Sequence, residues 1–552
     1  MTNYQFTGGT ICAPATIPGT GAISIIRVSG KESLAIADKV IDTKGVPIAE
    51  TEGYRLRYGT VFEADGSVLD NVIVSVFRAP HSYTGENSVE ISCHASRFIV
   101  NKILELLVNA GARIAAPGEF TRRAFVNGKM DLAQAEAVAD VIASQSAASH
   151  RVAMNQLKGG FSSELKVLRE KLLTMTSLLE LELDFSEEDV EFASRKELGQ
   201  LVDDSLTHIG RLTASFSRGN AIKNGVPVAI VGATNTGKST LLNALLGEER
   251  AIVSDIAGTT RDTIEETLNI DGILFRFIDT AGIRETDETI EKIGIDRTFK
   301  KLGEAAVVLG MTDLSRGEAA VLEDADFILS KVNEMGCVKN VGTENDGAGT
   351  GGASLAETGG ASLAETGGTP LSETGGASQH GHGDGQERKV VILVNKCDVA
   401  GDFYRDDDGT GYGSGNDLGE NMAEIGSNKN VNHDNNIVSL IENKYDNCKV
   451  IPISAKTGKG LSTLTKALGE IGSEITGSTD ETLVTNVRHY EALVRAASAL
   501  ERVRAGLHIA TLPPDLIAQD LREALYHLGE IVGEISTDET LGNIFRNFCI
   551  GK

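Results

Sequence analysis

A short glycine-rich segment near the middle of the chain has the composition of a phosphate-binding loop. Residues 232–239 read Gly-Ala-Thr-Asn-Thr-Gly-Lys-Ser. They follow a near-continuous apolar run at residues 226–231, as expected of a buried parallel strand, and precede residues 240–246, which we expect to form a helix. Glycines let backbone amides close around phosphates, and a helix N-terminus favours their negative charge. Lys238 is therefore predicted to reach the β- and γ-phosphates, and Ser239 to ligate Mg²⁺.

Two further motifs supply groups that respond to a γ-phosphate. Residues 258–260 read Gly-Thr-Thr, and residues 279–282 read Asp-Thr-Ala-Gly. The second motif follows an apolar run at residues 273–278, so Asp279 stands at the carboxyl end of a predicted strand, where open α/β sheets bind ligands. We expect Asp279 to hold the water shell of Mg²⁺, and the backbone amide of Gly282 to meet the γ-phosphate.

The choice of base is predicted from a third apolar run and the loop that follows it. Residues 389–394 precede an Asn-Lys-Cys-Asp motif at residues 395–398, and a Ser-Ala-Lys triplet follows at residues 454–456. Asp398 can accept two hydrogen bonds from the edge of guanine, whereas adenine would leave the carboxylate partly unpaired at a cost of roughly 1–3 kcal/mol. With these motifs in order and each in a suitable context, the sequence predicts a protein that binds GTP and hydrolyses it.

The residue after the Asp-Thr-Ala-Gly motif is unusual for a GTPase of the Ras type. Such proteins have a glutamine there, which orients the attacking water. Here the position is Ile283, whose side chain neither accepts nor donates a proton. Either hydrolysis is slow, or another residue positions the water. The next segment, residues 284–295, is rich in carboxylates, and its spacing alone favours a solvated helix face.

Length and composition indicate several domains in a cytoplasmic protein. A chain of 552 residues is too long for one hydrophobic core, and about three or four domains are expected. No apolar stretch approaches the ~20 residues that span a bilayer, and residues 1–16 carry no positive charge of the kind found in export or import signals. The six cysteines show no paired spacing, so neither disulfides nor zinc is expected. A formal charge of −26 argues against nucleic acid wrapping around the whole surface, but not against a local basic patch.

Two polar stretches interrupt the predicted nucleotide-binding region. Residues 351–378 repeat the unit Gly-Gly-Ala-Ser-Leu-Ala-Glu-Thr, and residues 401–436 are rich in Gly, Asp and Asn. Neither has enough apolar mass for a core, so both are expected to be disordered insertions on surface loops that flank residues 389–394. His380 and His382 are explained more simply as part of a flexible linker than as metal ligands.

The segments outside this region differ from it in pattern. The N-terminal part mixes short β-rich runs, at residues 72–77 and 89–93, with one helix near residues 95–110, which is an α+β pattern. Apolar residues recur at helical spacing from about residue 131 to 218 and again from about residue 481 to 548. A nucleotide-binding domain inserted between two halves of a helical domain fits this pattern.

Four segments outside the nucleotide motifs are specific enough to indicate a family. They are Gly-Ala-Ile-Ser-Ile-Ile-Arg-Val-Ser-Gly at residues 21–30, Ser-Tyr-Thr-Gly-Glu-Asn-Ser-Val-Glu at 82–90, Pro-Gly-Glu-Phe-Thr-Arg-Arg-Ala-Phe-Val-Asn-Gly-Lys-Met-Asp-Leu at 117–132, and the terminal Phe-Cys-Ile-Gly-Lys at 548–552. Together they closely resemble the MnmE (TrmE) family of tRNA-modifying GTPases. The resemblance covers nearly the whole chain apart from the two polar stretches.

The resemblance implies a multidomain fold. An α+β N-terminal folate-binding domain would precede an all-α central helical domain, into which a Ras-like α/β P-loop G domain is inserted. The implied boundaries are residues 1–122 for the tetrahydrofolate-binding and dimerisation domain, 123–222 and 471–552 for the two halves of the helical domain, and 223–470 for the G domain, with polar insertions at about 340–388 and 401–436.

An activity is implied as well. The chain would be the GTP-hydrolysing component of a complex that adds a carboxymethylaminomethyl or aminomethyl group to C5 of the wobble uridine, position 34, of certain tRNAs. A tetrahydrofolate derivative (5-formyl or 5,10-methylene) would supply the carbon, and an FAD-dependent partner of the MnmG type would supply the redox chemistry. The chain would be a homodimer whose G domains also pair across the nucleotide. The alternative is a ribosome-assembly or regulatory GTPase switch whose N-terminal domain is only a dimerisation module.

Site residues follow from the same resemblance, position by position. A potassium ion in place of an arginine finger would be held by Asn235, Ser254, Ile256 and Thr259, and Mg²⁺ by Ser239 and Thr260, with Asp279 in its water shell. Folate would meet Arg27, Glu90, Lys129 and Lys552. The residues implied to contact GTP are Asn235, Thr236, Gly237, Lys238, Ser239, Thr240, Ser254, Asp255, Ile256, Ala257, Gly258, Thr259, Thr260, Asp279, Thr280, Ala281, Gly282, Asn395, Lys396, Asp398, Ser454, Ala455 and Lys456.

Three residues are candidates for a catalytic role. Lys238 would stabilise charge on the phosphates. Glu291 is implied to orient the attacking water through a bridging water, which replaces the solvated-helix interpretation at that one position. Cys549 is either a thiolate nucleophile at the nucleobase or a residue packed where the tail meets the folate domain, and packing is the simpler interpretation.

Overall fold

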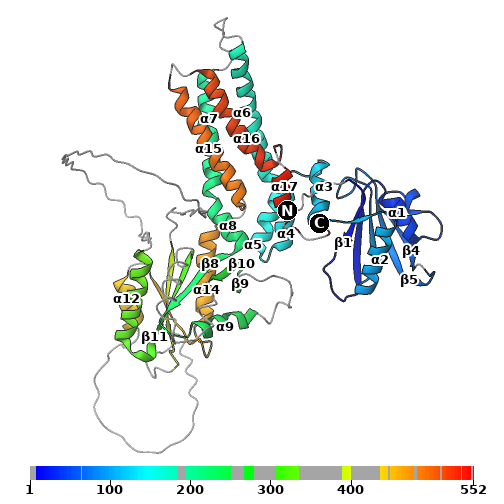
Figure 1. Cartoon of the computed structure of the whole chain (residues 1–552). Coiled ribbons are helices and arrows are strands. Elements are labelled where there is room, and N and C mark those ends of the chain that lie inside the picture. Colours follow the sequence, from blue (N-terminus) through cyan, green and yellow to red (C-terminus); the bar gives the residue numbers. More distant parts are fainter. Residues whose placement is uncertain are drawn as a thin grey trace, which may run out of the picture. The chain divides into compact units, whose positions relative to one another are not determined.

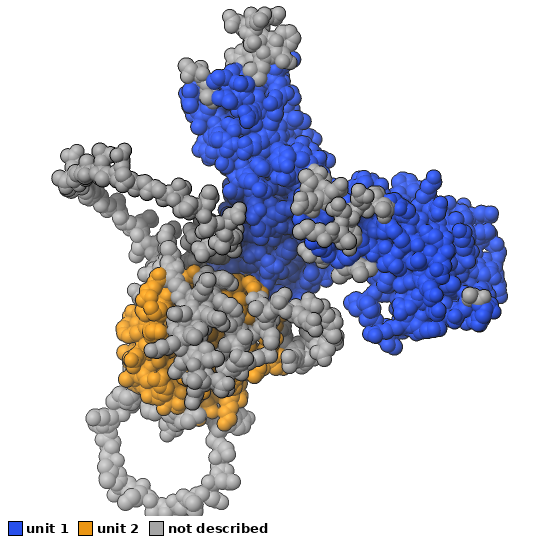
Figure 2. Space-filling view, viewed as in Figure 1, with its two compact units in different colours: residues 1–225, 271–274, 472–552 blue, residues 226–270, 275–471 orange. Residues whose placement is uncertain are grey.

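The chain is seen in a computed structural model (Figure 1). The structure describes residues 8–63, 65–184, 194–249, 266–278, 305–334, 388–398, 436–445, 448–477, 481–509, 513–535, 538–546, 548 and 551. It divides into two compact units (Figure 2): residues 1–225, 271–274 and 472–552 form unit 1, and residues 226–270 and 275–471 form unit 2.

The N-terminal part of unit 1 is built on a seven-stranded sheet. Its strands lie in the order β3-β4-β5-β6-β2-β1-β7; β1 is parallel to β7, and the other pairs are antiparallel. The strands are β1 (Ile11–Pro14), β2 (Ile23–Ser29), β3 (Ile41–Asp42), β4 (Arg55–Phe62), β5 (Val68–Phe77), β6 (Ser88–His94) and β7 (Arg113–Ile114). Two helices, α1 (Ser33–Val40) and α2 (Arg97–Asn109), pack on one face of this sheet, and a 3₁₀ turn, η1 (Ile48–Glu50), follows β3.

Alternation along β5 explains why one face of the sheet is buried. Val72, Val74 and Val76 point to the same side and belong to a core that also contains Ile36 of α1 and Ile103 of α2. The strands predicted at residues 72–77 and 89–93 are confirmed within β5 and β6, as is the helix near residues 95–110, which is α2. The expectation of a single helix was wrong, because α1 also packs here. With eight residues, α1 is too short for a clear helical period in the sequence.

The other face of this sheet carries exposed apolar side chains. Tyr58 on β4 lies directly opposite Ile73 on β5, and the two are 68% and 47% exposed. Leu56 lies two residues before Tyr58 on the same face, and Ile23 lies on that face of β2; both are exposed. We call Ile23, Leu56, Tyr58 and Ile73 the apolar sheet patch.

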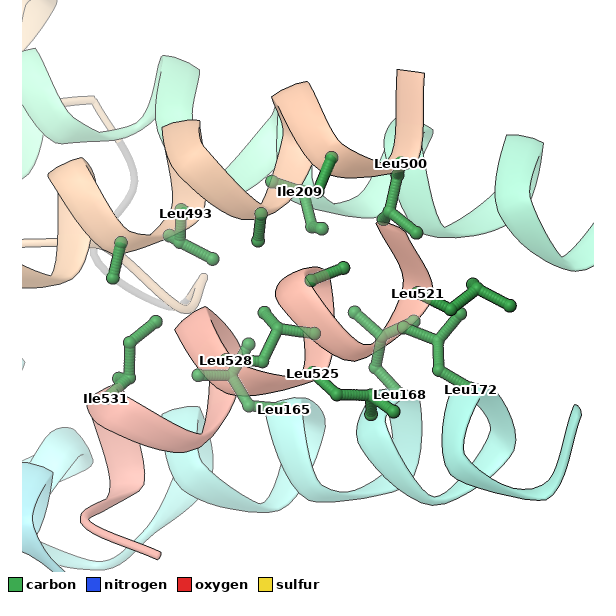
Figure 3. Packing of buried hydrophobic residues seen from close by; sticks show 14 of the residues in the cluster. Leu165, Leu168, Leu172, Ile209, Leu493, Leu500, Leu521, Leu525, Leu528 and Ile531 are labelled. Carbon is green, nitrogen blue, oxygen red and sulfur yellow. The ribbon is translucent and has the colours of Figure 1, made fainter. Parts of the chain in front are cut away.

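The rest of unit 1 is helical, and its core joins segments that are far apart in sequence. The helices are α3 (Glu119–Val126), α4 (Leu132–Ala143), α5 (Ala147–Leu157), α6 (Gly160–Asp184), α7 (Arg195–Ala214), α8 (Phe216–Asn224), α15 (Val487–Leu507), α16 (Pro514–Val532) and α17 (Asp538–Arg546). Figure 3 shows leucines of α6 packed against those of α16 and α15. Leu165, Leu168 and Leu172 are spaced three and four residues apart, which puts them on one face of α6. The helical spacing on both sides of residues 226–471 therefore builds one shared core.

A buried charged group also joins the two helical segments. The carboxylate of Glu136 on α4 accepts hydrogen bonds from Arg488 Nε at 2.9 Å and, at 2.6 Å from its other oxygen, meets His489 Nε2 on α15. Glu136 is 6% exposed and His489 is 1% exposed. Burial raises the pKa of Glu136, but the charges and hydrogen bonds of His489 and Arg488 outweigh it and lower the pKa from 4.5 to about 2. Glu136 is thus an anion that pairs with two basic side chains, Arg488 and His489.

Unit 2 contains a six-stranded sheet in the order β13-β12-β11-β8-β10-β9. Its strands are β8 (Val226–Gly232), β9 (Glu266–Ile270), β10 (Ile273–Ile278), β11 (Val307–Asp313), β12 (Lys389–Asn395) and β13 (Lys449–Pro452), and β10, β8, β11, β12 and β13 run parallel. The apolar runs predicted as strands at residues 226–231, 273–278 and 389–394 are confirmed as β8, β10 and β12.

Helices cover this sheet as parallel strands require. They are α9 (Lys238–Glu249), α12 (Glu318–Glu334), α13 (Asn436–Lys444) and α14 (Leu461–Thr476), with a short 3₁₀ turn, η3 (Leu314–Arg316), after β11. Val321 and Ile328 of α12 and Ile441 of α13 pack with Val308 and Ile392 of the sheet. In the part of the chain that the structure describes, no helix combines the length and the apolar character needed to cross a membrane.

Candidate functional site

The glycine-rich loop lies between β8 and α9. The strand ends at Gly232, and the helix begins at Lys238, two residues before the start predicted from sequence. Thr236 Oγ1 donates a hydrogen bond to the carbonyl of Ala233 at 2.9 Å, which closes the loop on itself. Gly237 has φ +97°, and a Cβ there would lie 2.5 Å from Asn395 Nδ2. Glycine is therefore required at this position by the backbone conformation and by the close approach of the guanine motif.

Lys238 points back into this loop. Its Nζ donates hydrogen bonds to the carbonyls of Gly232 at 2.8 Å and Ala233 at 2.7 Å. Burial lowers the pKa of the Lys238 ammonium. The cation is held by neutral oxygens at the start of a helix, where phosphate oxygens can replace the carbonyls as its partners and supply a negative charge. Asn235, which precedes Thr236 in the loop, has a left-handed backbone with φ +61°.

Asn395 links the three described motifs. Its Nδ2 donates to the carbonyl of Thr236 at 2.7 Å, and its Oδ1 accepts from the backbone amide of Ala455 at 3.0 Å. The side chain is buried, with 3% exposure. One amide therefore fixes the phosphate loop, the Asn-Lys-Cys-Asp motif and the Ser-Ala-Lys triplet relative to one another.

Asp398 is positioned by the same triplet. Ser454 Oγ donates a hydrogen bond to Asp398 Oδ1 at 2.7 Å, and Ser454 Oγ also accepts from the amide of Thr457 at 3.2 Å. Ser454 is fully buried. The carboxylate predicted to meet the guanine edge is thus held in a fixed direction by a buried hydroxyl.

These groups lie at the carboxyl edge of the sheet of unit 2. Gly232 ends β8, Asp313 ends β11 and Asn395 ends β12, and these three strands are neighbours. Asp313 and Asn395 are direct partners in the parallel register. Ligands of open α/β sheets bind outside the carboxyl ends of the strands, so the arrangement is that of a nucleotide site with its phosphate loop on β8 and its base loop on β12.

Asp313 is a member of this site that the sequence analysis missed. Its Oδ2 accepts a hydrogen bond from Lys396 Nζ at 2.6 Å, although the two residues are 83 positions apart. Lys396 itself has a left-handed backbone with φ +65°. A signal was present in the sequence, since Asp313 follows an apolar run at residues 307–311 much as Asp279 follows residues 273–278.

Many predicted site residues lie outside the described part of the chain. They include the γ-phosphate motifs, most of the potassium and magnesium ligands, the proposed water-orienting glutamate and both tail residues: Ser254, Asp255, Ile256, Ala257, Gly258, Thr259, Thr260, Asp279, Thr280, Ala281, Gly282, Glu291, Cys549 and Lys552. Of the predicted ion ligands, the structure places Asn235 and Ser239 in the phosphate loop and at the start of α9. Thr240 follows on α9, and Lys456 follows Ala455 in the triplet.

Two residues of the predicted folate site come together in unit 1. Arg27 and Glu90 are direct partners on β2 and β6, and Arg27 NH2 lies 2.8 Å from Glu90 Oε1. The guanidinium lies 5.2 Å from the ring centre of Tyr83 and 5.7 Å from that of Phe120. It also donates to the carbonyl of Gly551 at 3.3 Å, the residue before the predicted Lys552.

The third described member of that predicted site has a different partner. Lys129 Nζ donates a hydrogen bond to the carbonyl of Pro80 at 3.1 Å. Arg27 and Glu90 pair with one another and together carry no net charge. Lys129 is an exposed residue.

Comparison with known proteins agrees with the arrangement of motifs. The family described as the MnmE helical domain matches residues 132–549, and that described as the GTP-binding protein TrmE N-terminus matches residues 10–129. A protein of Parabacteroides distasonis named tRNA modification GTPase MnmE is 44% identical over 546 residues, covering 98% of this chain and 100% of that protein. Proteins of the same name from Bacteroides thetaiotaomicron and Flavobacterium johnsoniae are each 44% identical, covering 98% of this chain and 99% of theirs. The resemblance inferred from the four sequence segments is confirmed: the chain belongs to the MnmE family of tRNA modification GTPases.

Proposed function

We propose that this chain is the GTP-hydrolysing component of a complex that adds a carboxymethylaminomethyl or aminomethyl group to C5 of the wobble uridine of certain tRNAs. The observation that carries the proposal is the buried amide of Asn395, which joins the phosphate loop at Thr236 to the Ser-Ala-Lys triplet at Ala455. In a family whose relatives are named tRNA modification GTPases, this joint supports one guanine-nucleotide site that includes both the phosphate loop and the Asn-Lys-Cys-Asp motif.

Each end of the nucleotide has its own partners in this proposal. Lys238 exchanges the carbonyls of its loop for β- and γ-phosphate oxygens. Asp398, held by Ser454, accepts two hydrogen bonds from the guanine edge. The hydrocarbon stem of Lys396 lies against the flat base, since long cationic side chains cover apolar surfaces with their stems.

Two ions fit the donor set of the loop. Ser239, with Thr260 and with Asp279 through water, would hold Mg²⁺ by hard oxygen ligands, and the ion would neutralise phosphate charge. Potassium would be held by Asn235, Ser254, Ile256 and Thr259, and it would take the electrostatic role of an arginine finger. Among these, Asn235 has the left-handed backbone that turns the loop at this point. Glu291 would orient the attacking water, which Ile283 cannot do.

The N-terminal part of the chain would carry the one-carbon donor. Arg27, Glu90, Lys129 and Lys552 would hold a tetrahydrofolate derivative, 5-formyl or 5,10-methylene. The Glu90 carboxylate suits the amino and ring N–H groups of a pterin, and the partly exposed ring of Tyr83 lies beside Arg27, the partner of Glu90. Lys129 suits the acidic tail. The folate supplies the carbon atom, and an FAD-dependent partner of the MnmG type supplies the redox chemistry.

A homodimer in the cytoplasm completes the proposal. The apolar sheet patch is exposed although two of its members, Tyr58 and Ile73, are large side chains paired across neighbouring strands. Exposed apolar side chains on one face of a sheet are typical of an interaction site. We assign it to contact with a second copy of the N-terminal domain.

Nucleoside mass spectrometry of total tRNA tests the function directly. Cells that lack this protein should lose C5-aminomethyl-type uridines, and wild-type protein should restore them. Asp398→Asn should fail to restore them at normal GTP levels, because an amide cannot accept both hydrogen bonds from guanine. Unchanged uridines in the deletion strain would contradict the proposal and favour a ribosome-assembly or regulatory GTPase switch.

A further inference from the structure

The end of strand β11 carries a carboxylate whose two oxygens are both engaged. Asp313 Oδ1 accepts hydrogen bonds from the amide of Ser315 at 3.0 Å and from Ser315 Oγ at 2.6 Å. Its Oδ2 accepts from Lys396 Nζ at 2.6 Å. The Asp313 side chain is 6% exposed, and that of Lys396 is 34% exposed. The carboxylate is therefore a fixed, buried acceptor, and the lysine is the more exposed partner.

The position of Asp313 in the sheet places this contact between the phosphate loop and the base loop. β11 lies between β8, which carries the phosphate loop, and β12, which carries the base loop. Asp313 is the register partner of Asn395, the residue before Lys396. The left-handed backbone of Lys396, with φ +65°, takes its side chain out of its own loop and toward the end of β11. A lysine side chain with no partner would sample many rotamers, and binding would have to remove that freedom.

We propose that Asp313 is a positioning residue for the guanine nucleotide: it holds Lys396 in the conformation in which the lysine stem covers the base. The inference rests on the proposed function, because it assigns Lys396 to the nucleotide. It adds to the residues of the base loop a supporting residue that comes from a different strand and from none of the sequence motifs. Asp313 does not touch the nucleotide and acts through Lys396.

The ionised state of Asp313 agrees with this role. Burial raises its pKa, but the hydrogen bonds from Lys396 and Ser315 outweigh burial and lower the pKa below its usual value. The carboxylate is then charged throughout the neutral range. The ground-state affinity for GDP and GTP should depend on it equally, because both nucleotides share the guanosine that Lys396 covers.

The test is a double-mutant cycle on the full-length chain, read by titration with fluorescent mant-GDP and mant-GTPγS. Asp313→Asn keeps the size of the side chain but removes the charge that holds Lys396. We expect it to raise both Kd values by a similar factor of about tenfold, which corresponds to about 1.4 kcal/mol, and to raise KM while kcat at saturating GTP stays the same. Lys396→Gln should have a similar effect, and adding Asp313→Asn to it should produce little further change.

Two control variants separate positioning from structure. Ser315→Ala removes the hydroxyl on the other oxygen of Asp313 and leaves the ion pair in place. Asp324→Asn removes a surface ion pair with Arg316, whose N–O distance is 2.9 Å, on the elements that follow β11. Both should keep the Kd within about twofold of wild type, as expected for changes of a few tenths of a kcal/mol at exposed sites. Asp313→Glu keeps the charge at a different reach and should recover part of the affinity; it also serves in the cycle if Asp313→Asn does not fold.

The outcomes are distinct. A Kd unchanged in folded Asp313→Asn would overturn the inference, and so would an equally large effect of Asp313→Asn in the Lys396→Gln background, because Asp313 would then act by another route. A wild-type chain that binds neither probe, or Asp398→Asn protein with undiminished affinity for mant-GDP, would overturn the proposed guanine site and the inference with it. If Asp398→Asn weakens mant-GDP binding but the effects of Asp313→Asn and Lys396→Gln on the Kd are simply additive, the inference alone is overturned.

Discussion

Replacing Asn395 by alanine should separate the two loops that hold the nucleotide. The change leaves two buried backbone groups without their partner: the carbonyl of Thr236 and the amide of Ala455. Thr236 is 1% exposed and Ala455 is 4% exposed, so water does not readily replace the lost side chain. Each unsatisfied group costs about 1–3 kcal/mol, and we take about 3 kcal/mol for the pair. That free energy shifts the local opening equilibrium by about a hundredfold.

Hydrogen exchange measured by mass spectrometry reports this opening at the position where it occurs. In Asn395→Ala, a peptide containing Ala455 should exchange about a hundredfold faster than in the wild-type chain, by the same conversion. The Kd for mant-GDP should rise, because binding must close the loops again. Asn395→Asp provides a sharper variant: it keeps an acceptor for Ala455 but puts an oxygen where the donor to Thr236 was. Exchange at Ala455 should then stay near the wild-type rate while nucleotide affinity falls.

A matched control uses an amide whose hydrogen bond is exposed. Asn224→Ala removes the donor to Asn220 Oδ1, a bond of 2.6 Å at the end of α8. It should change neither exchange at Ala455 nor the Kd. If Asn395→Ala leaves the exchange of Ala455 unchanged and mant-GDP binding within about twofold of wild type, the buried amide is not the joint between the loops, and the argument for the site fails.

Three other changes test separate parts of the molecule. Glu136→Ala leaves the buried His489 and the partly buried Arg488 without their anion and should cost about 3–5 kcal/mol in urea unfolding followed by helical circular dichroism. Because the pKa of Glu136 is lowered from 4.5 to about 2, this difference from wild type should be complete above pH 4.5 and disappear as the pH falls toward 2. Gly237→Ala puts a Cβ 2.5 Å from Asn395 Nδ2 and should weaken mant-GDP binding by more than about tenfold, whereas Gly317→Ala, with a similar φ of +91° but no atom within 4 Å of the added carbon, should bind normally; equal affinities would refute the steric argument. Glu291→Ala should abolish most phosphate release while sparing GTP binding, and normal turnover would show that another residue orients the water.

The strands around the nucleotide site could be predicted from the sequence. The apolar runs at residues 226–231, 273–278 and 389–394 are strands, because continuous apolar side chains suit a parallel sheet that is covered on both faces. The motif at each strand end then places polar groups at one edge of the sheet. In the N-terminal sheet, the short β-rich runs at residues 72–77 and 89–93 located β5 and β6. The helix α1 was missed because eight residues include little more than two turns, too few for a period to be distinguished.

Contacts between distant segments could not be predicted from the periodicity of the sequence. Asp313 and Lys396 lie 83 positions apart, and Glu136 and Arg488 lie 352 positions apart. Neither pair has a spacing that a helix or strand period would indicate. Whether a charged residue is paired depends on which strand ends or helix faces become neighbours, and that is set by the strand order and by the packing of helical segments far apart in sequence. The same limit applies to Arg27 and Glu90: the resemblance names both residues, but their ion pair depends on β2 and β6 being neighbours in the sheet.

The anchoring of the base loop explains how the family motif persists beside two long polar stretches. Strand β12 is preceded in sequence by residues 351–378 and followed by residues 401–436. Among the described residues, three partners fix its end: Thr236 in the loop after β8, Asp313 at the end of β11, and Ala455 in the loop after β13. The position of the guanine motif is therefore determined by neighbouring strands of the sheet. Length can be added before or after β12 without altering these bonds, because the entropy of closing a loop grows only slowly with its length.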